Sequence, residues 1–220
     1  MTVARQRPRL ILSFILLGLV AGAVGIAYDR NRAAAEDEQP KGGEQVSDKQ
    51  DAAADEKEAA ADDYPFQRHF RVQSLDGGNG WLNTSGEITI QDLRGKVVIL
   101  DFWTYCCINC MHILPELKAL EQKYPNQLVV IGVHSAKFDN ERDTENIRQA
   151  IMRNEIEHPV VNDSEMKLWR KFFTRAWPTI GLIDPEGHFV GNLSGEFEHE
   201  RLDKAVLEPM IAYHRKKGTL

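Results

Sequence analysis

The stretch Asp101-Phe102-Trp103-Thr104-Tyr105-Cys106-Cys107-Ile108-Asn109-Cys110 decides the fold of this chain. It follows the apolar run Val97-Val98-Ile99-Leu100 and precedes a segment with helical periodicity, so Cys107-x-x-Cys110 falls where a strand turns into a helix. Unpaired N–H groups and the dipole at a helix start favour negative charge, which stabilises a thiolate there. Two cysteines at this spacing can close and reopen a disulfide by exchange. They are a poor zinc site, because tetrahedral zinc takes four ligands.

This stretch resembles the active-site segment of the thioredoxin superfamily, which reads Asp-Phe-Trp-x-x-x-Cys-x-x-Cys. The resemblance implies that Cys107 attacks a substrate disulfide and that Cys110 resolves the resulting mixed disulfide. Pro115 matches the proline that kinks the active-site helix. Asp101 ends an apolar strand, where a buried carboxylate has a raised pKa unless it is paired. With the resemblance, we expect Asp101 to take a proton from Cys110 and to return it.

A second segment, Trp177-Pro178-Thr179, resembles the cis-proline loop of the same superfamily. The resemblance implies that a cis bond before Pro178 presents backbone to the substrate opposite the cysteines. We therefore expect Trp177 and Pro178, together with Trp103 of the active-site stretch, to bind the substrate. The phrases from Phe102 to Cys110 and from Gly132 to Phe138 are similar to the thioredoxin-like domain that precedes NHL-repeat propellers.

The formal net charge of -6 is unevenly distributed. Residues 1–32 carry five arginines against one aspartate, and residues 33–63 carry eleven acids against three lysines. The remainder is almost neutral and offers no basic patch, so nucleic acid is not an expected partner. Three cysteines are too few for a disulfide framework, which leaves one redox pair and one odd thiol.

The segment from Leu10 to Ala27 is apolar apart from one serine and follows three arginines. Its length corresponds to about 27 Å of helix, close to the thickness of a bilayer's hydrocarbon core. Positive charge before it predicts that this end stays in the cytoplasm. We expect a single-pass signal anchor and a domain on the periplasmic or extracellular side. The alternative is a cleaved signal peptide with Ala21-Gly22-Ala23 as its small-residue site.

Residues 33–63 are rich in Ala, Glu and Asp and contain one large apolar residue, Val46. Such a segment cannot bury enough surface to offset the entropy of ordering, which predicts a disordered tether. We therefore expect a basic flank with a membrane anchor over residues 1–32, the acidic tether over 33–63, and a thioredoxin-like domain over 64–220.

Short apolar runs alternate with helix-periodic segments through the domain. The strands expected from these runs are Trp81-Leu82, Ile88-Thr89-Ile90, Val97 to Phe102, Leu128 to Val133, Pro159-Val160-Val161, Thr179 to Ile183 and Phe189 to Leu193. The expected helices run roughly over Cys107 to Tyr124, Thr144 to Arg153, Glu165 to Phe173 and Glu200 to His214. This order predicts an α/β, thioredoxin-like fold with a mixed central sheet, flanking helices and an N-terminal β extension.

Cys106 stands where common thioredoxins have tryptophan. A free cysteine most often packs as a small apolar residue, so we expect its side chain to point into the interior. Cys106 and Cys110 also form Cys-x-x-x-Cys, the spacing of copper-chaperone relatives, for which His134 or His112 would be the additional ligand. The Cys-Pro that usually follows that motif is missing here, so we expect no metal site.

These observations together predict a membrane-anchored thiol–disulfide oxidoreductase with a Cys-Ile-Asn-Cys redox pair and no cofactor. Its expected partners are protein dithiols or disulfides, a redox partner that recharges the pair, and the membrane through the N-terminal helix. Neither Ile108 nor Asn109 carries a charge that would set the direction of electron flow. The alternatives are a thioredoxin-like adaptor associated with NHL repeats, whose cysteines are structural, and a copper chaperone.

Overall fold

The structure, a computed structural model, describes residues 63–220. The expected basic flank, the segment from Leu10 to Ala27 and nearly all of the expected tether fall on residues 1–62, outside the described residues. The predicted membrane localisation needs correction, because no helix within residues 63–220 is long and apolar enough to cross a bilayer.

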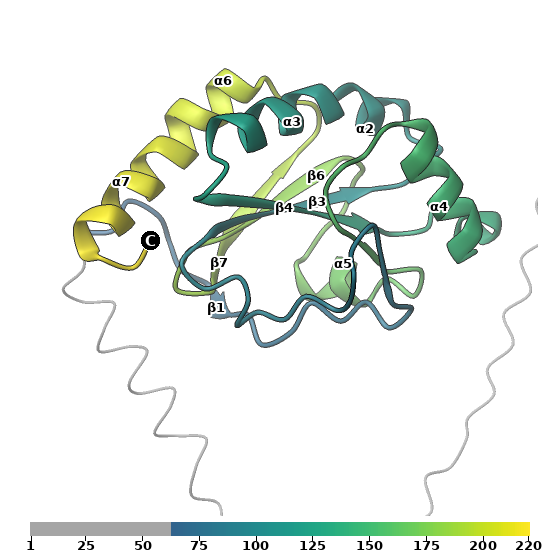
Figure 1. The fold of residues 1–220 in the computed structure, drawn as a ribbon, viewed down its shortest axis with the longest axis horizontal. Coiled ribbons are helices and arrows are strands. Elements are labelled where there is room, and N and C mark those ends of the chain that lie inside the picture. The colour runs from purple at the N-terminus through teal and green to yellow at the C-terminus, as the bar shows by residue number, and fades with distance from the viewer. Residues whose placement is uncertain (1–62) are drawn as a thin grey trace, which may run out of the picture. The chain divides into compact units, whose positions relative to one another are not determined.

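A mixed seven-stranded sheet in the order β1-β7-β6-β3-β4-β5-β2 forms the centre of the domain (Figure 1). Strand β3 (Val97–Trp103) pairs in parallel with β4 (Leu128–His134) and antiparallel with β6 (Thr179–Ile183). Beyond them lie β5 (Val160–Asn162) on one side and β7 (His188–Ser194) on the other. The two-residue strands β1 (Phe70–Arg71) and β2 (Trp81–Leu82) form the edges. The expected α/β fold with an N-terminal β extension is confirmed.

Every residue of β3 is buried, because both faces of the sheet are covered. Alternate side chains, Val98, Leu100 and Phe102, pack in one core with residues of the N-terminal extension and Leu168 of α5 (Lys167–Lys171). The intervening side chains face α3 (Leu114–Lys123) and α7 (Glu208–Lys217), which Figure 1 shows on the opposite side of the sheet from α5. Because side chains alternate along a strand, Asp101 lies on the α3 face.

The active-site helix is divided. The single helix expected from Cys107 to Tyr124 is instead α2 (Ile108–His112) and α3 (Leu114–Lys123), with Ile113 between them. Pro115 lies in the first turn of α3, where a missing N–H is tolerated because that group has no partner within the helix. The proline therefore begins a second helix.

The expected strand Ile88-Thr89-Ile90 is wrong, since these residues lead into a turn. The backbone N–H and the hydroxyl of Thr89 donate to the Asp92 carboxylate at 2.8 Å and 2.6 Å. Local side-chain hydrogen bonds of this kind compete with strand pairing. Ile90 is nevertheless buried, so its apolar character reflects core packing without a strand.

Among the remaining helices, α5 spans only Lys167–Lys171 of the expected Glu165 to Phe173, because Met166 before it has a left-handed backbone. Helix α4 (Thr144–Arg153) has the predicted bounds, and the short 3₁₀ helix η1 (Asp139–Glu141) precedes it. The last predicted helix is a succession of α6 (His199–Leu202), a π-helical segment η2 (Asp203–Leu207) and α7. Pro209 has no N–H for the helical hydrogen-bond ladder, which accounts for the irregular turn before it.

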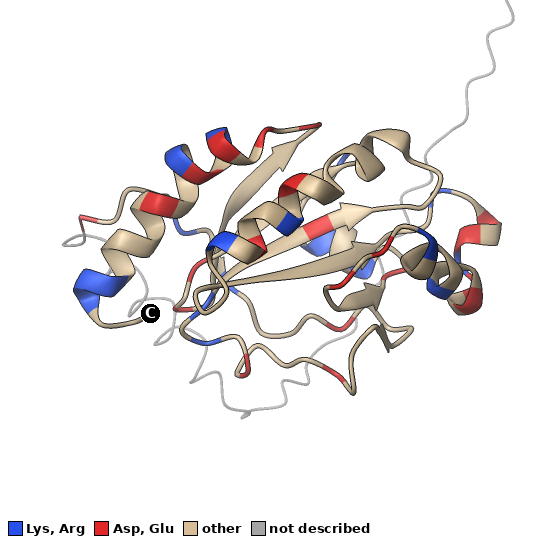
Figure 2. Cartoon of the chain, turned by 45° about the horizontal axis from the view of Figure 1, so that its top comes forward, with Lys and Arg blue, Asp and Glu red and all other residues tan. Residues whose placement is uncertain are grey.

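Charged residues are concentrated on the helices and loops, with both signs interleaved along them, while the strands are largely uncharged (Figure 2). A carboxylate inside the central strand is therefore an exception in this domain. Asp101 is that exception and is fully buried.

Candidate active site

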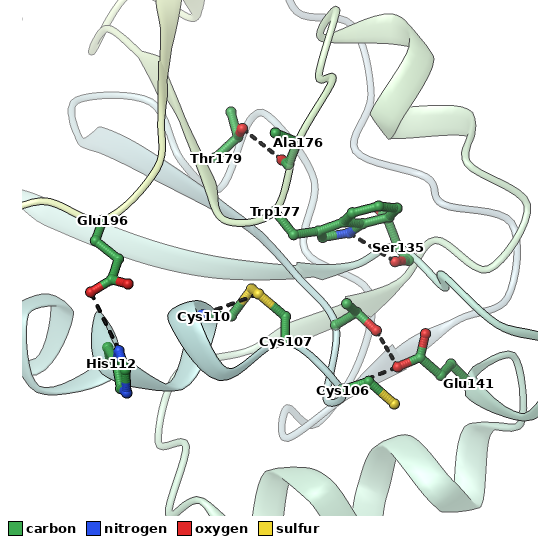
Figure 3. The surroundings of a disulfide bond; sticks show 11 residues. Cys106, Cys107, Cys110, His112, Ser135, Glu141, Ala176, Trp177, Thr179 and Glu196 are labelled. Carbon is green, nitrogen blue, oxygen red and sulfur yellow. Dashed lines mark hydrogen bonds and ion pairs between the residues drawn. A yellow bond between two sulfur atoms is a disulfide. The ribbon is translucent and has the colours of Figure 1, made fainter. Parts of the chain in front are cut away.

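Cys107 and Cys110 form a disulfide where β3 leads into α2 (Figure 3), with Cα atoms 5.2 Å apart. Cys107 is the N-cap of α2 and has an extended backbone, with φ -95° and ψ 104°. The backbone N–H of Cys110 points at the Sγ of Cys107 at 3.2 Å and also lies 3.1 Å from its carbonyl oxygen. An amide directed at a sulfur favours the thiolate over the thiol, so opening this disulfide yields a stabilised Cys107 thiolate.

The two sulfur-bearing residues differ in access. Cys110 is 0% exposed and belongs to a buried cluster with Trp103 and Ile147. Cys107 is half-buried at the border of that cluster, and the neighbouring Ile108 is 66% exposed. A partner sulfur approaching from solvent therefore meets Cys107 first.

The loop before β6 lies beside the disulfide. The Trp177–Pro178 peptide bond is cis, as predicted. Trp177 is half-buried and packs at the same cluster as Cys107. Its indole Nε1 donates to the backbone carbonyl of Ser135 at 3.1 Å, and its ring lies 4.2 Å from that of Trp169, centroid to centroid. The ring is thus held in place next to the accessible sulfur (Figure 3).

Asp101 lies on β3 between Gly132 of β4 and Ile180 of β6. It is 0% exposed, and neither carboxylate oxygen has a hydrogen-bond partner among the described residues. Burial raises its pKa to about 7, and the charge of His158 opposes part of this rise. A carboxyl group with such a pKa accepts and releases protons near neutrality.

The substrate-binding role expected for Trp103 needs correction. Trp103 is 0% exposed, so its side chain has no surface to offer a partner. Its ring meets that of His134 edge to face at 4.9 Å and packs in the cluster that buries Cys110. Trp103 is the last residue of β3 and packs against Ile147 of α4, so it is a core residue of the site.

Cys106 also departs from expectation, because it is exposed and does not pack in the interior. Figure 3 shows its sulfur directed away from the disulfide and toward Glu141. A hydrogen bond from the thiol to Glu141 raises the pKa of Cys106, and partial burial and the negative charge of Glu141 raise it further. Cys106 is therefore accessible but poor in thiolate.

Glu141 is a residue of the site that the sequence did not single out. It is fully buried, and its carboxylate accepts hydrogen bonds from the Thr104 hydroxyl at 2.5 Å and the backbone N–H of Cys106 at 3.1 Å. Two more come from the N–H groups of Lys137 and Phe138, at 2.7 Å and 2.9 Å. Burial opposes ionisation, but hydrogen bonds from the Cys106 thiol, the Thr104 hydroxyl and the 137–138 backbone outweigh it and lower the pKa of Glu141. A Ser or Thr three residues earlier would have signalled this cap, and Phe138 stands there instead.

The copper alternative requires Cys106, Cys110 and a histidine to meet. Cys106 points away from the pair, and Cys110 is in the disulfide. His134 is buried, which lowers its pKa to about 4, and its nitrogens have no partner among the described residues. His112 is exposed and faces Glu196 at 3.3 Å. In this disulfide-bonded form, these side chains do not gather into a ligand set within residues 63–220.

A different cluster, Asp184, Glu186 and His214, brings ligand-type atoms within 4.8 Å of one another at the β6–β7 turn. Arg68 already bridges its two carboxylates, with Nε 2.9 Å from Asp184 and Nη2 2.6 Å from Glu186. The guanidinium and Lys217, which lies 3.0 Å from Glu186, balance the two acids, and Arg68 ties the N-terminal extension to this turn.

The mixed sheet, the disulfide at the helix that follows its central strand, and the cis-proline before an antiparallel strand together define a thioredoxin-like domain. The chain contains such a domain: residues 95–189 match the family model described as thioredoxin-like. A solved structure of a thioredoxin-like protein in the oxidised form has 27% sequence identity and a TM-score of 0.57, covering 66% of this chain and 97% of that one.

Two relatives place the domain in different contexts. NHL repeat-containing protein 2 of Bos taurus is 47% identical over 160 residues, which are 70% of this chain and 22% of that protein. The chain thus corresponds to a small part of that relative. The thiol-disulfide oxidoreductase YkuV of Bacillus subtilis is 29% identical over 142 residues, which are 62% of this chain and 95% of YkuV. The expected resemblance to thioredoxin-like proteins, including those with NHL repeats, is confirmed.

Proposed function

We propose that this domain is a thiol–disulfide oxidoreductase whose redox pair is Cys107 and Cys110. The observation that carries the proposal is the disulfide itself, which joins an accessible sulfur at a helix start to a fully buried one. Asp101 supplies a buried acid with a pKa of about 7 on the same face of the sheet. The similarity to an oxidoreductase from Bacillus subtilis supports the same reaction class.

In the reducing direction, the Cys107 thiolate attacks one sulfur of a partner disulfide. A mixed disulfide forms, and the other partner sulfur leaves as a thiolate that takes a proton from solvent. The Cys110 thiol then gives its proton to the Asp101 carboxylate, and the Cys110 thiolate attacks the sulfur of Cys107. The second partner thiolate leaves, so the partner gains two electrons and the domain holds a disulfide. The reverse sequence oxidises a partner dithiol.

The partners in this proposal are protein dithiols or disulfides and a second redox partner that restores the starting state. Trp177 forms the docking surface, because it is half-buried beside the accessible sulfur, whereas Pro178 is buried and has little surface to offer a partner. The Trp177 ring is fixed by Ser135 and Trp169, so its position does not depend on the partner. A rigid aromatic side chain loses little entropy when a polypeptide docks against it.

The test is reduction of insulin by the full chain with dithiothreitol as electron donor. The parent is compared with Cys107→Ser and with the matched control Cys106→Ser, which removes the neighbouring thiol. We expect the Cys107 variant to lose at least about a hundredfold in rate, because the nucleophile is gone. The Cys106 variant should retain the parent rate. Equal rates for parent and Cys107→Ser would refute the proposal.

A second candidate is a thioredoxin-like adaptor whose disulfide is structural, favoured by the 47% identity to an NHL repeat-containing protein. The reduction potential of the Cys107–Cys110 pair separates the two functions. A value below about -300 mV is typical of inert structural disulfides and would support the adaptor. A higher value would leave the pair open to exchange with cellular thiols.

A further inference from the structure

Several buried polar atoms gather around Gly132, where β4 has no side chain. Within residues 63–220, both carboxylate oxygens of Asp101, the indole Nε1 of Trp103 and the Nε2 of His158 have no hydrogen-bond partner. Asp101 is paired with Gly132 in the parallel register of β3 and β4. A Cβ atom at position 132 would lie 3.0 Å from the Trp103 nitrogen and 3.4 Å from the His158 nitrogen. The glycine therefore leaves room for these polar groups to approach one another.

His158 extends from the buried polar atoms around Gly132 to the protein surface. The residue is 6% exposed, and its other ring nitrogen, Nδ1, lies 3.7 Å from the Oε2 of Glu121 on α3. The Glu121 side chain is 31% exposed. Both residues line a surface cavity of about 280 Å³ between α3 and the segment 154–158. One ring nitrogen thus faces the interior, and the other faces a carboxylate in contact with solvent.

The two buried groups also interact electrostatically. Burial raises the pKa of Asp101, and the charge of His158 acts in the opposite direction. A fully buried carboxyl group has no direct contact with bulk solvent, so a proton that it exchanges with solvent must pass through another group. Imidazole suits this task, because it can take a proton at one nitrogen and release one from the other.

We propose that His158 is the relay residue through which Asp101 exchanges its proton with solvent, a role that rests on the oxidoreductase function proposed above. When Asp101 has taken the proton of Cys110, its O–H bond breaks and an Nε2–H bond forms on His158, either through one bridging water or after the two side chains have moved into hydrogen-bond contact. The Nδ1–H bond of the imidazolium then breaks, and that proton goes to Glu121 or water. When the disulfide is reduced again, a proton returns by the reverse route. The ring therefore regains its first tautomer over a complete cycle.

The charges around the ring are compatible with transient protonation. Asp101 faces it from β3 and Glu121 from α3, and both are acids. Lys118 of α3 also lines the cavity, but it pairs with Glu157 at 2.5 Å, so its charge is directed to another acid. Glu155 also lines the cavity. An imidazolium at this position thus meets mostly negative side chains.

The test uses the reduced full chain in a Cys106→Ser background, mixed with one equivalent of dithiobis(nitrobenzoate). Attack by Cys107 releases one thionitrobenzoate, and resolution by Cys110 releases the second, so the two steps are seen separately. At pH 6, below the pKa of about 7 of Asp101, most of this carboxyl group is protonated and must first lose its proton. We expect His158→Gln to slow the second release about tenfold at pH 6. At pH 9 the effect should be less than about twofold, because Asp101 is ionised at the start.

Two controls separate a relay from a merely structural role. His69→Gln alters an exposed histidine of the N-terminal extension and should leave both releases unchanged. In His158→Ala, added imidazole should restore the second release at pH 6, because the surface cavity admits a small base. Slowing that is equal at both pH values and insensitive to imidazole would overturn the relay.

The outcomes also distinguish this proposal from the one on which it rests. If Cys107 releases no thionitrobenzoate, the oxidoreductase proposal fails, and the relay falls with it. If both releases occur and His158→Gln matches the parent at pH 6, the relay alone is wrong. Should the variants misfold, carboxyl ¹³C NMR of the oxidised parent decides. The Asp101 carboxyl signal and the ring signals of His158 must then change together as the pH is varied, and an Asp101 change that leaves the His158 ring signals unaffected would overturn the relay.

Discussion

The Oε1 of Glu141 accepts a 2.5 Å hydrogen bond from the hydroxyl of Thr104, and both residues are fully buried. This contact joins η1 to the turn that carries the cysteines, although the two residues are far apart in the chain. The same carboxylate binds the backbone N–H of Cys106 and two N–H groups of the 137–138 segment. The conformation of the turn before Cys107 is therefore set by a carboxylate from another part of the chain.

Replacing Glu141 should change the chemistry of Cys106. Glu141→Gln removes the carboxylate that raises the pKa of the Cys106 thiol, so more thiolate forms at neutral pH. We expect alkylation of Cys106 by iodoacetamide at pH 7 to accelerate by about threefold to tenfold. Peptide mapping of the reduced chain measures this rate. An unchanged rate would show that Glu141 does not control the thiol.

The order of cysteine alkylation in the reduced parent is a second prediction. Cys107 should react first with a brief pulse of iodoacetamide near neutral pH, because it is accessible and the amide of Cys110 favours its thiolate. Cys106 is exposed, but its raised pKa keeps it protonated. Cys110 is shielded by burial. First labelling of Cys106 or Cys110 would contradict the assignment of the nucleophile.

Asp101 should make the stability of the oxidised domain depend on pH. Its pKa is about 7 in the folded domain and near 3.8 in an unfolded chain, so the folded state binds the proton more tightly. Below about pH 4, Asp101 is protonated in both states and does not lower the free energy of unfolding. As the pH rises from about 4 toward 7, the free energy of unfolding falls, because only the unfolded chain readily loses this proton. Asp101→Asn should therefore raise the free energy of unfolding by about 3 kcal/mol at pH 8 and change it little at pH 4. Urea unfolding at both values measures this, and equal effects would contradict the raised pKa.

The ion pair between Arg68 and Asp184 should have the opposite pH dependence. Burial opposes ionisation of Asp184, but hydrogen bonds from His188 and Arg68 outweigh it and lower the pKa to about 2. Its contribution is present above about pH 4 and disappears as pH falls toward 2. Arg68→Met leaves a buried carboxylate without its cation, which should lower the free energy of unfolding by about 3 kcal/mol at pH 7.

The matched control for this ion pair is Arg71→Met. Arg71 is exposed and makes one long hydrogen bond, 3.3 Å, to the Glu186 carbonyl. We expect a change below about 0.5 kcal/mol for this variant. The difference in the free energy of unfolding between the parent and Arg68→Met should be smaller at pH 2.5 than at pH 7. An equal difference at both pH values would show that the ionised Asp184 carboxylate is not its cause.

Features with a local signature were predictable from the sequence. The β-branched apolar run from Val97 predicted the central strand, because a strand covered on both faces needs apolar side chains at every position. Asp184-Pro185-Glu186-Gly187 predicted the turn of the β6–β7 hairpin, since proline and glycine adopt the backbone angles that turns require. The strand-to-helix position of Cys107 and Cys110 followed from the periodicity on either side.

The sequence by itself therefore determined most of the strands and helices and the position of the cysteine pair, since both depend on residues close together in the chain. It did not predict β1, and the strand that it predicted at Ile88-Thr89-Ile90 is absent. Only the tertiary structure decided the surroundings of that pair. Burial of Trp103, exposure of Cys106 and the hydrogen bonds of Glu141 all depend on segments that meet through folding. The approach of His158 to Gly132 beside Asp101 has the same origin. The periodicity of apolar residues predicts which side of a helix or strand is buried. It does not predict which polar side chain from another element packs against that side.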